Sequence, residues 1–382
     1  MNNNHELHHT YSDNITHKRI FIIGPTPPPL GGVSVHVKRV IAKLKQQHNT
    51  VYQINPEALY RFSFLRKIPF KYGAQIWYFM GLCAKIFYYQ PDMVIYHSFC
   101  ARNSIPELMI ITALKKIISY TSVLIEHDCR HMYQRSRRWK QWFSSFLTQC
   151  DQLVCIGDIT HKSYGDNSIT IPLKVNIESA FLPPILSEEK AICATYPPAL
   201  FTFLATHKLI IVVNAFQLTL WQGRDLYGIE QAIEMIKNIK ESYSTIGLII
   251  VLGSVGDEQY YQLLMERIET YVLHDAIFIM CGQKELWPLL KYAMVFIRPT
   301  LSDGYSVSIE EALYLGTLVV ASDVCKRPVG TVLYKVGDMV DLSKKVKDIV
   351  QKKEHFHARQ GNAKHPNKMS TTTYECCHCL HT

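Results

Sequence analysis

The stretch Ile297–Asp323, which reads IRPTLSDGYSVSIEEALYLGTLVVASD, decides the fold of this chain. A short apolar run, Ala293–Pro299, leads into it and ends at a proline, as is typical of a buried strand. Turn-forming residues follow, then apolar residues at helical spacing, then a second apolar run, Leu318–Ala321. The pattern predicts one βαβ unit, with parallel strands and a right-handed connection.

Two carboxylates lie near the start of the predicted helix. Asp303 follows the first strand at its carboxyl end, where open α/β sheets bind ligands. Glu311 comes eight positions later, about two helical turns further on. The free N–H groups of the helix start, those of Tyr305, Ser306 and Val307, are expected to point at an anion. The pattern indicates a nucleotide-sugar site, with amides for the phosphates and carboxylates for the hydroxyls.

Each part of this signal also has a simpler explanation. Ser308 and Glu311 have the spacing of a capping box, in which the glutamate only satisfies a backbone N–H. Asp303 and Gly304 have the composition of an ordinary turn. The complete run, with its flanking strands, favours a ligand site over either explanation taken alone.

The stretch resembles the donor-site motif of the retaining, two-domain (GT-B) glycosyltransferases of the "glycosyl transferases group 1" family, and is family 4-like. That motif is a carboxylate, seven residues, Glu-Ala, and then Gly-x-x-Val-Val-Ala-Ser-Asp. Here it reads Asp303, seven residues, Glu311-Ala312, and then Gly316–Asp323, with Asp where the family usually has Glu.

The resemblance implies an α/β fold in which two Rossmann-like, doubly wound domains face a cleft. It also implies that a sugar is transferred from a nucleotide-sugar donor with retention at the anomeric carbon. In such a site Glu311 binds the donor ribose, Asp303 binds the sugar hydroxyls, and the backbone of Gly304–Val307 holds phosphate.

Composition restricts the class of protein. The 382 residues suffice for two α/β domains, and 48% hydrophobic with 19% charged residues is typical of a globular chain. No apolar run has the length of a membrane span, and the polar start lacks the apolar region of a secretory signal, so we expect a cytoplasmic protein. The eleven cysteines form no disulfide-like pattern, which suits a reducing compartment.

The net charge of +9 needs an explanation. No nucleic-acid-binding motif accompanies it, so we expect no nucleic-acid partner. Contact with an anionic membrane surface is the favoured explanation, and a plain solvated basic surface is the open alternative.

The chain is expected to divide into four segments. These are a disordered lead over 1–18, an N-terminal Rossmann-like acceptor domain over 19–184, a C-terminal nucleotide-sugar donor domain over 185–350, and an atypical, disordered tail over 351–382. The step Pro183-Pro184 is the expected hinge. In the second domain, strands are predicted at 209–213 and 247–252, and helical periodicity is predicted to end at Val350.

The first domain contains two candidate site elements. By the resemblance, Gly31 and Gly32 let acceptor and donor phosphate approach the backbone, although they are also suited to forming the turn alone. His127 follows the predicted strand 123–125 and best matches the family's histidine that contacts the transferred sugar. His97 is the alternative, and either histidine also fits a purely structural, hydrogen-bonded role.

Two stretches combine basic and aromatic residues: RFSFLRKIPFKY over 61–72 and YQRSRRWKQWFSSFL over 133–147. Both are candidates for contact with a membrane surface or a lipid-linked acceptor. Packing on the same domain is an equal alternative for the first stretch, and core packing accounts for some of the aromatic residues in the second.

The start of the second domain departs from the family. After its first strand the family has an Arg and then a Lys-Gly, which hold the donor diphosphate; the corresponding places here hold Gln217 and Gln222-Gly223. Arg224 supplies the missing charge if the loop shifts by two residues. Otherwise the site lacks electrostatic stabilisation on the order of several kcal/mol. The donor-binding candidates of this region are Asn214, Arg224 and Gly253.

We therefore expect a hexosyltransferase that moves a sugar from a nucleotide sugar to a lipid-linked saccharide during bacterial surface-polysaccharide assembly, such as that of capsule or O-antigen. No metal and no other cofactor is expected, because no Asp-x-Asp pair occurs in a suitable loop and helix-start amides can carry the diphosphate charge. One alternative is a catalytically weak or inactive relative that acts as a binding or partner protein. A nucleotide-sugar 2-epimerase of the same fold is disfavoured by the basic-aromatic stretches.

Overall fold

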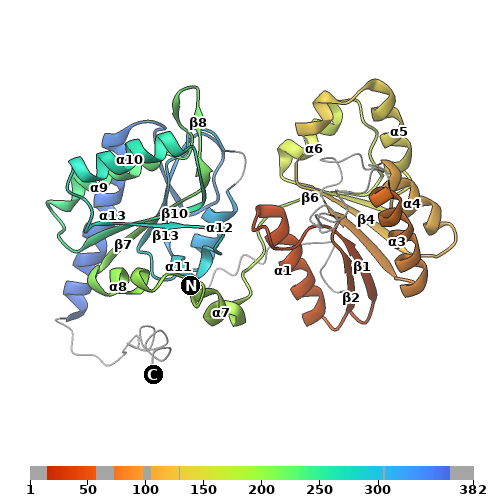
Figure 1. The fold of residues 1–382 in the computed structure, drawn as a ribbon, viewed down its shortest axis with the longest axis horizontal. Coiled ribbons are helices and arrows are strands. Elements are labelled where there is room, and N and C mark those ends of the chain that lie inside the picture. Colours follow the sequence, from red (N-terminus) through yellow and green to blue (C-terminus); the bar gives the residue numbers. More distant parts are fainter. Residues whose placement is uncertain (1–14, 57–72, 98–104, 129, 304–305, 362–382) are drawn as a thin grey trace. The chain divides into compact units, whose positions relative to one another are not determined.

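Runs of Ile, Val, Leu and Phe form the strands of two parallel six-stranded sheets, and the segments between them form helices on both faces of each sheet (Figure 1). The computed structural model describes residues 15–56, 73–97, 105–128, 130–303 and 306–361. The chain divides into two units, Met1–Ile185 and Leu186–Thr382. The expected α/β class with two Rossmann-like, doubly wound domains is confirmed.

Unit 1 has the strand order β2-β1-β3-β4-β5-β6. Its strands are β1 (Arg19–Ile23), β2 (Thr50–Ile54), β3 (Met93–His97), β4 (Thr121–Glu126), β5 (Gln152–Ile156) and β6 (Val175–Glu178). Its helices are α1 (Gly32–Gln46), α3 (Gly73–Tyr89), α4 (Ile105–Lys115), η2 (Arg130–Gln134), α5 (Arg137–Leu147) and α6 (Asp158–Asp166).

Alternation along β1 sets the two cores of unit 1. Ile20 and Ile22 pack on one face with the apolar side of α1. Phe21 and Ile23 pack on the other face with residues of α3, α4 and α5. Because successive strand side chains point to opposite faces, a continuous apolar run such as RIFII fits a sheet that is buried on both sides.

Unit 2 has the strand order β11-β10-β7-β12-β13-β14. Its strands are β7 (Leu209–Leu218), β8 (Leu220–Trp221), β9 (Arg224–Asp225), β10 (Ile246–Gly256), β11 (Ile277–Cys281), β12 (Val295–Arg298), β13 (Leu318–Ser322) and β14 (Thr331–Tyr334). Its helices are η3 (Leu186–Glu188), α7 (Glu189–Cys193), α8 (Pro198–Thr206), α9 (Ile229–Lys240), α10 (Glu258–Thr270), α11 (Trp287–Leu290), α12 (Val307–Tyr314) and α13 (Met339–Gly361). In Figure 1, α9 and α10 cover one face of the sheet, and α8 and α11 cover the other.

Each sheet has one place where the strand order reverses. In unit 1 the connections run outward from β1 and β3, and in unit 2 they run outward from β7 and β12. Ligands of open α/β sheets bind at such a switch point, outside the carboxyl ends of the strands. The topology therefore directs attention to the loops after these four strands.

Two strands of unit 2 are longer than the sequence predicted. β7 continues to Leu218 and β10 to Gly256, and they pair through Ser254 and Gln217 with a bulge beyond. Glycines make this close approach possible, since a Cβ on Gly253 would lie 2.8 Å from the carbonyl oxygen of Phe216. The sequence did not predict these extensions, because they contain polar residues and glycines, which have low intrinsic strand propensity.

The last described helix also exceeds the prediction. α13 runs from Met339 to Gly361, past the predicted end of helical periodicity at Val350. The continuation, QKKEHFHARQG, lacks an apolar stripe but is rich in residues with good intrinsic helix propensity. Residues 362–382 of the predicted tail and 1–14 of the predicted lead lie outside the described residues.

Candidate functional site

An ion-paired cluster lies at the switch point of unit 2. Asp303 Oδ2 accepts a hydrogen bond from Arg298 Nε at 3.2 Å and another from Arg327 Nη1 at 2.8 Å. Arg298 also donates through Nη1 to Asn214, to its carbonyl oxygen at 3.2 Å and to its side-chain Oδ1 at 3.3 Å. The cluster therefore connects β7 with the loop that follows β12. These are the two strands on either side of the point where the strand order reverses.

The charges of this cluster do not cancel. Only 11% of the Asp303 side chain and 2% of the Arg327 side chain are exposed. Burial alone would raise the pKa of Asp303, but the two guanidinium groups outweigh it and lower that pKa, so the carboxylate is ionised. Two cations around one anion leave a net positive charge at this edge of the sheet, which suits an anionic ligand.

The two arginines differ in how fully they are engaged. Arg327 also donates to Ser322, through Nε to the carbonyl oxygen at 3.0 Å and through Nη2 to Oγ at 3.3 Å. Arg298 stacks over the ring of Tyr227 at 5.3 Å. Among the described residues, Arg298 Nη2 has no hydrogen-bond partner, so this is the guanidinium that can bind a further anion.

Backbone packing holds the loop after β12 in place. Thr300 Oγ1 donates to the carbonyl oxygen of Leu226 at 2.7 Å, and the amide of Leu301 donates to the same oxygen at 2.9 Å. Gly228 has φ +71, and a Cβ there would lie 2.1 Å from the carbonyl oxygen of Pro299. The glycine is thus required by this contact, which fixes the start of α9 against the loop that carries Asp303.

The helix after this loop begins where the motif predicted. α12 starts at Val307 with Ser306 as its N-cap, and the Oγ atoms of Ser306 and Ser308 are 3.0 Å apart. Ser308 is the second helical residue rather than the cap, so the capping-box explanation of Glu311 is wrong. Glu311 is 8% exposed on α12. Gly304 and Tyr305 lie outside the described residues.

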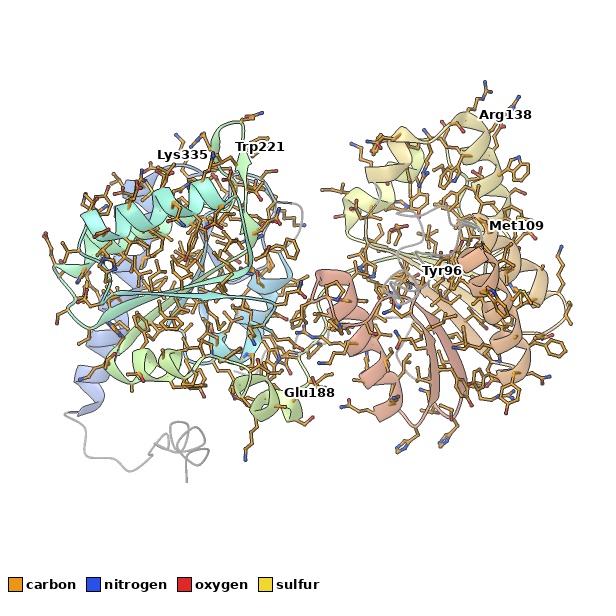
Figure 2. All side chains as sticks on the ribbon, viewed as in Figure 1. Tyr96, Met109, Arg138, Glu188, Trp221 and Lys335 are labelled. Atoms are coloured by element: carbon orange, nitrogen blue, oxygen red, sulfur yellow. The ribbon has the colours of Figure 1, made fainter. Side chains whose placement is uncertain are left out.

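The other donor-binding candidates of unit 2 have varied surroundings. Arg224 is exposed on the β8–β9 hairpin, with Nη2 against Gly337 in the loop before α13. Gln222 and Gly223 form the hairpin turn, both with positive φ. Figure 2 shows Trp221 of this hairpin at the edge of the unit. Gly253 lies within β10, where its close approach to β7 explains the glycine; its predicted role toward a donor, like that of Arg224, stays a prediction.

The paired glycines of unit 1 have no such structural reason. Gly31 is extended with φ −151, and Gly32 is the first residue of α1. A Cβ on Gly32 would meet nothing within 4 Å, and one on Gly31 would meet only Ser34 Oγ at 3.9 Å. Neither packing nor backbone conformation therefore demands glycine here, which leaves room for a ligand close to the backbone.

Three histidine rings meet at the switch point of unit 1. His97 ends β3, His127 follows β4, and His36 comes from α1. His97 Nδ1 and His127 Nε2 are 3.3 Å apart, and the ring centroid of His36 lies 4.7 Å from that of His127. Burial, with His36 nearby, holds the pKa of both His97 and His127 well below the usual value, so both rings are neutral. The two histidines that the sequence offered as alternatives are in contact.

The basic-aromatic stretch 133–147 is largely part of the fold. Phe143 is buried, and Trp139 and Phe146 pack against the same core of unit 1. Trp142, at 59% exposed, is the aromatic side chain of α5 that points outward. Figure 2 shows Arg138 of α5 at the upper edge of unit 1. The other stretch, 61–72, lies outside the described residues.

A more extensive apolar surface lies on α3. Trp77 is 71% exposed and Tyr88 is 80% exposed, and three further large side chains of the same helix are more than half exposed. These three are Ile76, Met80 and Phe87. Large apolar surfaces of this kind mark contact sites. The sequence did not single out this helix, because its apolar residues run all round it. Within the described ranges, no helix is long and apolar enough to cross a membrane.

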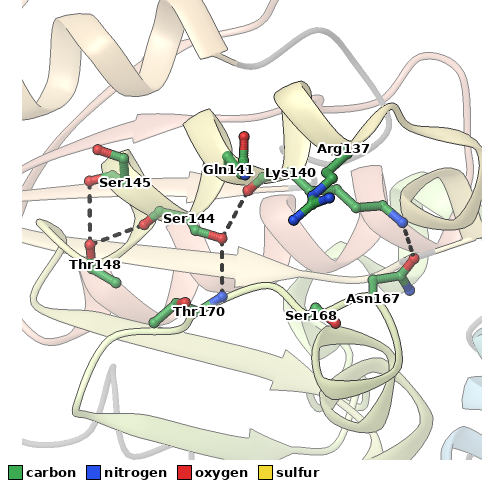
Figure 3. A pocket seen from close by; sticks show the side chains of 9 residues that line it. All are labelled: Arg137, Lys140, Gln141, Ser144, Ser145, Thr148, Asn167, Ser168 and Thr170. Carbon is green, nitrogen blue, oxygen red and sulfur yellow. Dashed lines mark hydrogen bonds between the residues drawn. The ribbon is translucent and has the colours of Figure 1, made fainter.

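A shallow polar groove of about 790 Å³ runs along the other side of α5 (Figure 3). Lys140 Nζ donates to Asn167 Oδ1 at 2.8 Å, and Ser144 Oγ accepts from the amide of Thr170 at 3.0 Å. These bonds tie α5 to the segment after α6. The groove is accordingly explained by packing within unit 1.

Comparisons with known proteins agree with this geometry. Residues 217–372 match the model of the family "Glycosyl transferases group 1". The matched range contains both Asp303 and Glu311, and it supports the resemblance drawn from their motif. Among curated proteins, none matches this sequence.

Solved structures share the fold across most of the chain. A glycosyltransferase from Rickettsia africae has a TM-score of 0.57 at 13% identity, covering 88% of this chain and 89% of that one. Anabaena HepE in complex with UDP has a TM-score of 0.54 at 11% identity, covering 88% and 90%. Sucrose-phosphate synthase from Thermosynechococcus elongatus has a TM-score of 0.53 at 15% identity, also covering 88% and 90%. At these identities the likeness concerns the fold alone.

Proposed function

We propose that this chain is a glycosyltransferase that uses a nucleotide sugar, with the donor held by unit 2. The observation that carries the proposal is the positive cluster of Arg298, Asp303 and Arg327 beside the start of α12. Cations and helix-start amides are the groups that bind a diphosphate. The family match over residues 217–372 and the UDP bound to the similar Anabaena protein support the same class of ligand.

Roles within the donor site follow from the contacts. Arg298 contacts the diphosphate, and so replaces the cation that the sequence lacks at Gln217 and Gln222. Both ion pairs of Asp303 use Oδ2, so Oδ1 remains for the predicted contact with a sugar hydroxyl. Glu311 binds the ribose, as in the resembled family. Because amides and Arg298 carry the diphosphate charge, transfer needs no divalent ion at the donor.

The mechanism and the acceptor follow from the resemblance. The sugar is a hexose transferred with retention, as in family 4-like enzymes, and His127 assists near the anomeric carbon. The exposed apolar face of α3 and the net charge of +9 favour a lipid-linked saccharide at an anionic membrane surface. The pathway class is surface-polysaccharide assembly.

A thermal-shift series followed by a turnover assay tests the proposal. A ligand that binds the folded state raises the melting temperature, so nucleoside diphosphates and their sugars are ranked by their shifts, beginning with UDP and UDP-glucose. The best sugar nucleotide should then be hydrolysed slowly without acceptor, and Glu311→Ala should abolish both the shift and the turnover. Absence of any shift across the series would refute the donor site.

One observation favours a second candidate, a relative that binds a nucleotide sugar without turnover. Gln217 lies within β7 and Gln222 in an exposed turn, so neither supplies the cation that the family uses. Stabilisation by a sugar nucleotide without hydrolysis or transfer, unchanged in Gln222→Lys, identifies this candidate instead.

A further inference from the structure

The histidine cluster of unit 1 has the dimensions of a metal site. One ring nitrogen from each of His36, His97 and His127 lies within 4.8 Å of the other two. Zinc binds imidazole nitrogen at about 2.0–2.1 Å in tetrahedral geometry, which places two ligand nitrogens about 3.4 Å apart. His97 Nδ1 and His127 Nε2 are already 3.3 Å apart.

The same distance is long for a hydrogen bond between two rings. Protein hydrogen bonds with an N–H donor usually span about 2.7–3.2 Å. The other ring nitrogen of His97, Nε2, is buried and has no hydrogen-bond partner among the described residues. The two rings therefore face one another without a good hydrogen bond, and an ion between them would bind both.

The third ring is oriented for metal binding. His36 Nδ1 lies 2.9 Å from the carbonyl oxygen of Ala180. A carbonyl oxygen only accepts, so Nδ1 carries a proton and Nε2 is the nitrogen of this ring that a metal would bind. Metal-binding histidines typically donate their other ring N–H to a carbonyl or carboxylate in this way.

A buried carboxyl group lies beside the cluster. Glu126 is fully buried, and its Oε1 accepts the amides of both His127 and Asp128 at 3.0 Å. This carboxyl group therefore lies one residue from a ring of the cluster. A divalent cation held by the three imidazoles would favour its ionised form, which would partly neutralise the charge of the ion.

We propose that His36, His97 and His127 form a binding site for a divalent transition metal, with zinc as the best match to three imidazole ligands. Three protein ligands leave the fourth tetrahedral position open, as in zinc sites that bind water or a small ligand. The proposal adds a second ligand class, on a different sheet from the diphosphate-binding cluster, and gives His127 a role besides the one proposed for it near the anomeric carbon. Its test measures metal content rather than transfer, so the two proposals can fail separately.

Zinc content measures the site directly. The full chain carries Cys376, Cys377 and Cys379 near its end, so all proteins are prepared with these three cysteines changed to serine. After dialysis against a limiting free Zn²⁺ concentration, the background protein should hold one zinc more than His36→Ala, His97→Ala or His127→Ala. In each of these variants the affinity for zinc should fall at least about 100-fold. Loss of a residue that only hydrogen-bonds to a metal ligand already lowers metal affinity about 10–100-fold.

Controls separate the site from general effects of mutation. His161→Ala, on α6 of the same unit, should keep the zinc. Circular dichroism checks the fold, and His36→Gln retains an N–H donor for Ala180 where His36→Ala does not. If the alanine variants fail to fold, Co²⁺ added to the background protein decides. A visible spectrum of tetrahedral cobalt with nitrogen ligands supports the site, whereas octahedral or thiolate-bound cobalt overturns it. Equal zinc content in the background protein and in folded cluster variants also overturns it.

Discussion

The Nε atom of Arg298 lies 3.2 Å from Oδ2 of Asp303, and only 11% of either side chain is exposed. The family motif treats the acidic residue at this place as a ligand of the sugar. Here the carboxylate also orients a cation. Under the proposed function, this contact would link the residue that holds the sugar to the residue that holds the diphosphate.

Arg298 is expected to be needed for binding the diphosphate. Arg298→Ala removes the guanidinium whose Nη2 has no hydrogen-bond partner among the described residues. The value of kcat/KM for transfer should fall by roughly 10²–10³, the usual effect of losing one preorganised donor at developing charge. Steady-state kinetics and calorimetric binding of the nucleoside diphosphate measure the change. Arg267→Ala, which removes a surface pair with Glu230, is the control and should leave both values unchanged. Equal loss in the two variants would contradict the assigned role.

Asp303 is expected to contribute to stability in a pH-dependent way. Its pKa is lowered in the folded chain, so its ion pairs stabilise the fold above the usual aspartate pKa of about 3.9 and are lost as the pH falls through the lowered value. Asp303→Asn leaves two buried guanidinium groups without their anion, which should cost roughly 3–5 kcal/mol at neutral pH.

Urea unfolding of both proteins between pH 7 and about pH 3 checks this expectation. The difference in unfolding free energy should be constant near neutral pH and should shrink below about pH 4, as the wild-type carboxylate takes up a proton. A difference that stays constant down to the lowest pH would mean that Asp303 is not the titrating group.

Local patterns predicted the centre of unit 2 well. The βαβ unit around Asp303 and Glu311 has its strand, loop, helix and second strand where periodicity and turn residues indicated. The residues that contact Asp303 in the folded chain were harder to predict. Arg327 lies 24 positions further along the chain, and the contact forms only because β13 packs beside β12. The available signal for Arg298 was a basic residue at the carboxyl end of a strand, and for Arg327 it was a basic residue in the loop after the next strand.

The contacts that the sequence did not predict join residues that are far apart in the chain. His97 and His127 were identified as alternatives because each ends an apolar run, but only the adjacency of β3 and β4 shows that they touch. His36 gave no strand-end signal, since it lies on α1. The extension of β7 escaped notice for a related reason: it depends on pairing with β10 rather than on the residues of β7 alone.

Two glycines with similar backbone angles are expected to respond differently to alanine. Gly223 in the hairpin turn and Gly228 before α9 both have positive φ, which costs an L-residue about 1–2 kcal/mol. Only at Gly228 would the new Cβ collide with the carbonyl of Pro299. Gly228→Ala should therefore lower the free energy of unfolding by on the order of 1–3 kcal/mol more than Gly223→Ala does, because strain at the Pro299 contact adds to the effect of positive φ. Thermal unfolding compares the two, and similar losses would count against the contact.

Gly32 is expected to matter for a ligand and not for the fold. Because a Cβ there meets no atom within 4 Å, Gly32→Ala should leave the melting temperature equal or slightly higher, as alanine favours a helix. If the backbone of this loop approaches a bound ligand, the added methyl should reduce transfer at least about tenfold. Gly165→Ala on α6 is the matched control, since its Cβ also meets nothing within 4 Å. If Gly32→Ala transfers the sugar at the wild-type rate, Gly32 serves only to form the turn.

The exposed face of α3 is expected to bind an anionic lipid surface. Full burial of one large apolar side chain contributes about 1.5–3 kcal/mol, so each of Trp77→Ser and Tyr88→Ser should weaken binding to vesicles of phosphatidylglycerol and phosphatidylcholine about tenfold. Flotation or cosedimentation measures the bound fraction. Val272→Ser, an equally exposed apolar position in unit 2, should leave binding intact. Added salt should weaken the wild-type interaction further, because the basic charge is screened. Binding that is indifferent to Trp77 and Tyr88 would assign the membrane contact elsewhere, or show that α3 meets a protein instead.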